Sequence, residues 1–203
     1  MKLFQNRQAA LAIAIALLTP TLLWAQKETL GIIEVRAKKA VEEKVAQSGN
    51  TLEIKQVLGS LNGALNTSFQ KTGKFTIVSR DNLKALLEEM AVSGNATLTG
   101  AKYILDTTVT GFQDTSVTNS GEAGVTFRRE IILSGTAEIK KLNGELLQSA
   151  LFVVTNSIGR TVLPQALTKL LGESNTLLES VPKEAAHQIA IYVMSEISSP
   201  PEV

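Results

Sequence analysis

The sequence contains no cysteine and a single histidine, His187, and these two shortages remove most familiar reaction centres. Without cysteine there can be no disulfide, no thiol nucleophile and no thiolate metal site. The lipid-modified cysteine that anchors bacterial lipoproteins is excluded as well. One histidine cannot build a multi-histidine metal centre, and it leaves one candidate for a Ser-His-Asp triad. We interpret His187 as a structural residue, because it lies among the apolar-face positions of a C-terminal helical pattern.

Excess charge of one sign is also missing, and aromatic side chains are few. The 203 residues include 20 Lys+Arg and 19 Asp+Glu, and aromatic residues make up 4%. Nucleic-acid-binding domains usually carry a clear basic excess, and single-strand binders add aromatic stacking platforms. We therefore expect no nucleic-acid partner.

The longest uncharged run lies at the N-terminus. The segment AALAIAIALLTPTLLWA follows Lys2 and Arg7 and ends at the polar QKET, which is typical of a secretory signal peptide. We predict a signal peptide over residues 1–25 and a periplasmic mature protein with no stable membrane span. The alternative is an uncleaved anchor, because an apolar run of about 17 residues reaches the lower limit for crossing a bilayer.

Hydrophobic periodicity after the signal predicts one α/β (α+β) domain over residues 26–198 and a disordered tail over 199–203. The expected fold is a mixed, mainly antiparallel sheet with helices packed on it, in the order β-α-β-α-β-β-β-α. In the first half of the chain we expect a strand over 29–37, a charged loop to Asn50, a helix to Gly73, a strand over 75–78 and a helix over 82–90. A linker over 94–100 leads to a strand over 101–112, a polar loop over 113–124, a strand over 125–142 and a returning strand. The chain then continues with an irregular segment with short helical turns over 157–181 and a helix opened by Pro182.

The first predicted helix carries clear end signals and two unusual glycines. Asn50 suits the N-cap, with Glu53 placed for a capping box, and Gly73 suits the left-handed stop. Gly59 and Gly63 each cost about 1 kcal/mol relative to alanine within a helix. We expect close approach of another backbone to compensate for them.

The dipeptide Asn143-Gly144 is the strongest turn signal in the chain and predicts a two-residue type I′ hairpin. Such a turn sets the strand register, because pairing continues outward from it residue by residue. The predicted pairs are Leu133 with Val154, Gly135 with Phe152, and Ala137 with Ala150. A large ring facing a glycine can lie across the neighbouring strand without a clash.

Three segments together resemble the family of curli assembly/transport components (CsgG-like), which includes lipoproteins that activate penicillin-binding proteins. They are LNTSFQKTGKFTIVSRDNLKALLEEM, GAKYILDTTVTGF and AEIKKLNGELLQS, and the resemblance covers residues 30–155. It implies an α/β domain used for docking and assembly, not catalysis. The chain departs from the family in lacking the lipidated cysteine. The curli channel subunit also inserts hairpins into the membrane, whereas QDTSVTNSGEAG is too short, so we predict that this protein forms no pore.

No catalytic, cofactor-binding or metal-binding residue is predicted. Gly94, Gly100 and Lys102 only superficially suggest a phosphate loop, because their spacing fails the Walker pattern. Nothing in the sequence shows that scattered acids such as Asp106 pair with one another. Arg128 and the two charged residues that follow it form a cluster, which is either a solvated strand edge or a docking patch for a partner. The predicted docking residues are Asp114, Glu122, Arg128 and Arg129.

These observations lead to one functional hypothesis with two alternatives. We expect a non-enzymatic periplasmic protein that assists assembly or regulation in the cell envelope by binding another envelope protein or itself. One alternative is a pore- or ring-forming secretion subunit of the curli type. The other is a small-molecule-binding or hydrolytic enzyme with a cleft between the sheet and residues 157–181.

Overall fold

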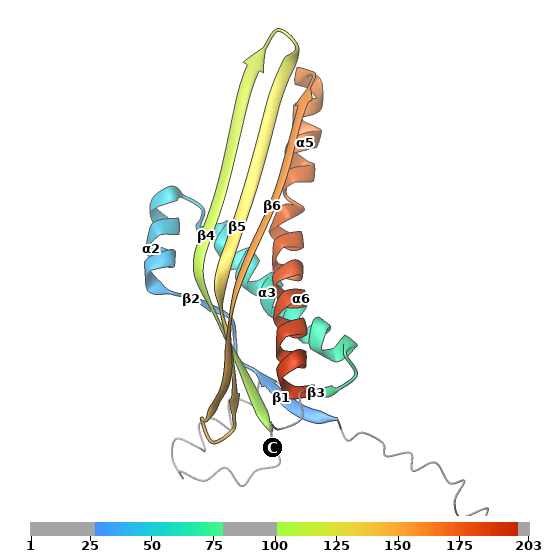
Figure 1. Ribbon diagram of the computed structural model, residues 1–203. Coiled ribbons are helices and arrows are strands. Elements are labelled where there is room, and N and C mark those ends of the chain that lie inside the picture. The colour runs from blue at the N-terminus through green and yellow to red at the C-terminus, as the bar shows by residue number, and fades with distance from the viewer. Residues whose placement is uncertain (1–26, 79–100, 199–203) are drawn as a thin grey trace, which may run out of the picture.

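The computed structural model describes residues 27–78 and 101–198, which form a mixed sheet with helices packed on it (Figure 1). The elements are β1 (Glu28–Ile32), β2 (Arg36–Ala37), α2 (Lys39–Ser48), α3 (Thr51–Lys71), β3 (Phe75–Val78), β4 (Tyr103–Gly121), β5 (Gly124–Lys141), β6 (Leu146–Val162), a 3₁₀ turn (Pro164–Ala166), α5 (Leu167–Ser174) and α6 (Leu177–Ser198).

The six strands run in the spatial order β3-β1-β4-β5-β6, with the short β2 also paired to β4. β1 pairs with β3 and β4 in parallel, and β2 pairs with β4 in parallel. The long strands β4, β5 and β6 are antiparallel. The predicted class, a mixed α+β fold, is confirmed.

One face of the long strands is buried against the helices. Strict alternation in β5 places Ile131, Leu133 and Ile139 in the core, while Ser134 and Thr136 alternate with them on the other face, as predicted. The same core cluster contains the buried side chains of α2, α3 and α6. In Figure 1, α6 runs alongside β6 over much of its length.

The helix α2 replaces the loop predicted over residues 38–50. Val41 and Val45 lie one turn apart and are both buried, so two apolar residues in a charged stretch suffice to dock it. Gly49, with φ of +80°, ends α2 in the left-handed conformation. The Ser-Gly-Asn sequence is therefore a helix stop and not a loop.

The polar stretch 113–124, predicted as a loop, continues the sheet instead. β4 runs to Gly121 and pairs with β5 along its whole length. Ser116, Thr118 and Asn119 are exposed, so this part of the strand shows no apolar alternation that sequence reasoning could detect. Backbone pairing, which is independent of side-chain type, holds it in the sheet.

Two boundaries near the C-terminus also differ from those predicted. Residues 157–162 belong to β6, and only the part after them is helical or irregular. Pro182 lies inside α6, which begins at Leu177. The buried positions Leu178, Val181 and Ala185 continue across the proline, so packing outweighs the backbone hydrogen bond that proline cannot make.

The predicted register of β5 and β6 is confirmed at all three pairs, although the predicted turn type is wrong. The N–H of Lys141 donates to the carbonyl of Glu145 at 2.9 Å, which closes a loop of three residues. Gly144 has a φ of +85°, whereas no described non-glycine residue has a positive φ, so Asn143 cannot adopt a type I′ turn. A register shift between Ile139 and Lys140 compensates for the extra loop residue.

The glycine predictions have mixed outcomes. A Cβ on Gly135 would lie 2.5 Å from Cζ of Phe152 and 2.5 Å from the carbonyl oxygen of Thr108, so the ring does cover this glycine. The close backbone approach expected at Gly59 and Gly63 is wrong, because no described atom outside their own helix lies within 4 Å of a Cβ built there.

Both ends of α3 lie where the sequence predicts them, but the predicted capping hydrogen bond is not formed. Asn50 is the N-cap residue, yet its side chain makes no capping hydrogen bond. Gly73 has the expected left-handed conformation.

Several predictions fall outside the described residues. These are the signal peptide, the helix over 82–90, the linker over 94–100 and the tail over 199–203. Among the helices of residues 27–78 and 101–198, none has the length and apolar character needed to cross a membrane.

Replacing Gly135 with alanine should lower the free energy of unfolding by about 1–3 kcal/mol, because the added methyl group overlaps Phe152 and the backbone at Thr108. The matched control is Gly59→Ala, where space is open and the change should raise stability by about 0.5–1 kcal/mol. Urea unfolding measures both. A Gly135→Ala variant as stable as the wild type would contradict the packing described here.

Candidate functional site

The four predicted docking residues lie on the distal part of the β4–β5 hairpin, but only two of them meet. Asp114 is on β4 and Arg129 on β5, and their side chains pair on the helix-covered face. Arg128 projects to the opposite face, where its exposed guanidinium contacts Glu130 at 3.1 Å. Glu122 is exposed in the hairpin turn.

A β-bulge explains why Asp114 points inward. The register between β4 and β5 shifts between Val109 and Gly111, so the residues facing the helices change from odd to even numbers. Phe112 and Asp114 therefore follow Val109 on the buried face. An unbroken alternation would have placed Gln113 there.

The Asp114–Arg129 pair is a nearly buried, bidentate ion pair. The Arg129 Nε donates to Oδ1 at 2.9 Å and Nη2 donates to Oδ2 at 2.5 Å, with side-chain exposures of 7% for Asp114 and 11% for Arg129. The hydrogen bond to Asp114 raises the pKa of Arg129 above its ordinary value. The guanidinium stays charged throughout the physiological range.

The same guanidinium joins the sheet to the helical layer. Its Nη1 donates to Oδ1 of Asn175 at 2.7 Å and lies 3.4 Å from Oγ of Ser174, where α5 ends. Asp114 and Arg129 thus satisfy one another and hold the end of α5 against the hairpin. Their role in docking a partner stays a prediction.

A cleft of about 260 Å³ lies beside this pair, between the sheet, α5 and the start of α3. It is the place where a substrate cleft was predicted as an alternative, and it contains two carboxylates, Glu53 and Asp114. Asp114 is held on both oxygens by Arg129, so it is not available as a general acid or base.

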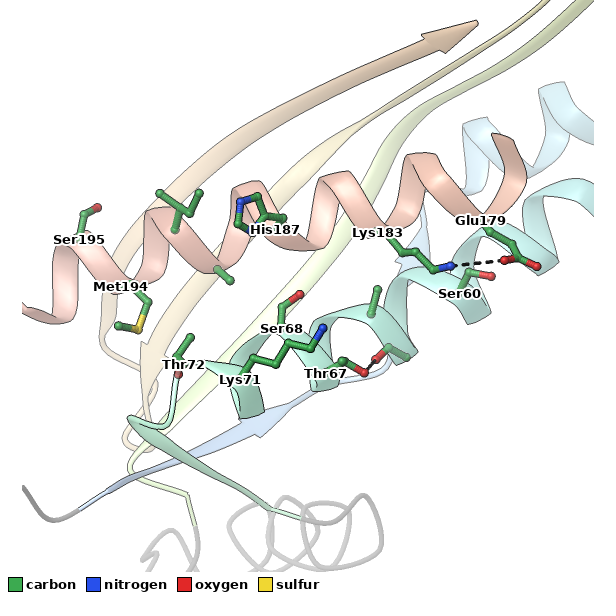
Figure 2. Close-up of a pocket in the computed structure, with 14 residues that line it drawn as sticks. Ser60, Thr67, Ser68, Lys71, Thr72, Glu179, Lys183, His187, Met194 and Ser195 are labelled. Carbon is green, nitrogen blue, oxygen red and sulfur yellow. Dashed lines mark hydrogen bonds and ion pairs between the residues drawn. The ribbon is translucent and has the colours of Figure 1, made fainter. Parts of the chain in front are cut away.

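A groove of about 1020 Å³ lies between α3 and α6 (Figure 2). Small side chains line its α3 wall, including Ala64, and Gly63 adds open space there. On the α6 wall, Met194 is apolar and His187 is exposed. Gly63 is the sequence signal for this groove, although the expectation from its helical position is a close backbone contact.

The polar groups of the groove come from both of its walls. Lys183 Nζ lies 3.4 Å from Oε2 of Glu179, one helical turn away, as the dashed line in Figure 2 shows. Ser68 and Lys71 belong to the opposite wall. Within residues 27–78 and 101–198, no group of three or more His, Cys, Asp and Glu side chains could hold a metal ion.

The edge strand β6 is a second candidate surface, which sequence reasoning missed. β6 is the last strand of the described sheet and has 17 residues. Its segment LLQSALFVVTNSIG, residues 146–159, contains no charged residue and no proline. Leu151 is 83% exposed and Val153 64% exposed, on the face opposite the helices.

At alternate residues of β6, the backbone N–H and C=O groups point away from β5 and out of the edge of the sheet. The Tyr192 hydroxyl of α6 donates to the carbonyl oxygen of Ser149 at 3.2 Å, which shows that Ser149 faces outward from β5. Because backbone direction alternates in an antiparallel pair, Leu151 and Val153 also present their N–H and C=O groups outward. A hollow of about 400 Å³ lies beside Ser149 and Tyr192, between β6 and α6.

No family model and no curated protein matches the chain. Solved structures resemble it at low similarity. A hypothetical protein from Chlamydia trachomatis shares 7% identity with a TM-score of 0.48, over 86% of this chain and 99% of the other. A minor lipoprotein from Acinetobacter baumannii shares 13% with a TM-score of 0.44, over 85% and 97%. Rare lipoprotein B from Shewanella oneidensis shares 12% with a TM-score of 0.33, over 57% and 86%. All three scores lie below 0.5, so no functional conclusion rests on them.

Replacing Arg129 with methionine should lower the free energy of unfolding by about 3–5 kcal/mol, because Asp114 is left as an unpaired, nearly buried charge. The matched control is Arg128→Met, whose exposed ion pair contributes at most about 1 kcal/mol. Adding Asp114→Leu to Arg129→Met should recover part of the loss. Equal unfolding midpoints in urea for the two single variants would contradict the structural role of this pair.

Proposed function

We propose that this chain is a non-enzymatic component of the cell envelope that works by binding protein through the open edge of β6. The observation that carries the proposal is an edge strand that is uncharged over residues 146–159 and exposes the side chains of Leu151 and Val153. Extended segments of partner proteins add to such edges through backbone hydrogen bonds, and side-chain contacts then supply specificity.

The composition of β6 is unusual for an edge left to solvent. Natural edge strands are commonly blocked by lysine, proline, bulges or short length. β6 has its only register shift near its start, and the next fourteen positions from Leu146 lack charge and proline. A surface of this kind is explained when a second strand covers it.

The N-terminal sequence supports a location for this binding in the cell envelope. The signal-like segment over residues 1–25 supports export to the periplasm, and the resemblance to curli assembly/transport components supports a role in envelope assembly. The absence of catalysis belongs to the same proposal. It is supported by the neutralisation of Asp114 by Arg129 and of Glu179 by Lys183.

Photo-crosslinking in the bacterial envelope tests the proposal. A crosslinking amino acid at Val153 should form protein adducts, whereas the same group at Val117, also exposed but on β4, should form far fewer. Introducing Leu151→Lys should remove the adducts formed from position 153, because it places a charge in the middle of the edge. Equal yields from positions 153 and 117, or adducts that survive Leu151→Lys, would count against β6 as the binding surface.

A further inference from the structure

We propose that the strand that covers β6 is β6 of a second copy of this chain, paired antiparallel about a two-fold axis. This inference rests on the proposed function, namely that β6 binds protein, and names the partner. The pairing would join two sheets edge to edge into one continuous sheet.

The first argument is that β6 is complementary to itself. Residues 146–159 carry no charge, so two copies can lie side by side without opposing like charges. The seven residues from Ser149 to Thr155 alone provide a ladder of about 24 Å at about 3.4 Å per residue. The exposed apolar side chains of one copy then cover those of the other.

The second argument comes from the charges that flank this segment. Glu145 precedes it and Arg160 follows it, and both side chains are solvent-accessible. An antiparallel pair brings Glu145 of each copy to the end of the ladder where Arg160 of the other lies. Unlike charges therefore meet at both ends, although each side chain already contacts a residue of its own chain, Lys141 or Glu173.

The third argument fixes the register. Ser149 faces outward, so only outward-facing residues of odd number can form the hydrogen-bonded pairs between the two copies. Placing Leu151 opposite Val153 brings the two most exposed large apolar side chains of the strand together twice, by symmetry. In this register Ser149 lies opposite Thr155, and its carbonyl oxygen can accept a second hydrogen bond beside that of Tyr192.

A head-to-tail arrangement fits less well. The distal part of β4, from Gly111 to Gly121, has no described strand on its outer side, because β1 and β2 pair only with residues up to Val109. Its exposed residues are polar except for Val117, so it does not match the apolar face of β6. Pairing about a two-fold axis also closes, whereas head-to-tail pairing continues into chains or rings.

The absence of cysteine allows a direct test by disulfide formation. Leu151→Cys and Val153→Cys are made in separately tagged full chains, mixed and oxidised mildly. Residues in hydrogen-bonded antiparallel pairs have Cα atoms about 5.5 Å apart, which suits a disulfide. The mixed 151–153 disulfide should form several times more than either symmetric disulfide, and Val117→Cys should form none above the level of random collision.

Each remaining result decides the question. Symmetric disulfides at 151 or at 153 alone would still support two-fold pairing through β6, with its register moved. A disulfide between positions 151 and 117 would overturn the two-fold arrangement in favour of head-to-tail contact. The absence of any disulfide at 151 or 153, with a monomer throughout a sedimentation series, would overturn self-pairing.

A second measurement needs no cysteine. Val153→Lys should weaken the dimer by about tenfold or more, because symmetry places a charge in the ladder at two positions, while Val117→Lys should leave it unchanged. Sedimentation equilibrium reads this shift directly. If the wild type is monomeric but photo-crosslinks from position 153 reach a different protein, self-pairing fails and the proposed function stands.

Discussion

Burial of a single face of the long sheet is the constraint from which the other features of this protein follow. β4, β5 and β6 each run for seventeen residues or more, and the helices pack on one side of them. The alternation of β5 provides the apolar layer that α3 and α6 cover. The same arrangement leaves the opposite side chains of β6, above all Leu151, in solvent.

Two local contacts make this one-sided packing specific. The ring of Phe152 lies over Gly135, a position where no larger residue fits, and so selects one register of β5 against β6. Farther along the hairpin, Arg129 binds Asp114 and Asn175 and ties the sheet to the end of α5. The fit of Phe152 over Gly135 thus fixes the middle of the β5–β6 pair, and a shielded ion pair fixes the hairpin nearer its distal turn.

The groove between α3 and α6 and the edge of β6 are open surfaces, and the proposed binding role depends on the second of them. The groove between α3 and α6 is broad, and its carboxylate Glu179 is paired with Lys183. The edge of β6 offers backbone hydrogen bonds and apolar side chains, which are the means by which proteins add strands to one another. The proposed role in envelope assembly through β6 unites these features with the signal-like segment at the N-terminus of the sequence.

The sequence by itself determined the fold class, the long strand β5, the ends of α3 and the pairing of Gly135 with Phe152, because periodicity and local turn chemistry encode these features. It did not reveal α2, whose docking depends on two valines. It also did not reveal the distal part of β4, whose polar residues pair with β5 through the backbone. Only the tertiary structure decided that Asp114 is buried, since a bulge before Gly111 reverses the faces of β4. It also decided that β6 is an edge strand. Strand order depends on which segments meet in space, and the residues of β6 by themselves do not predict it.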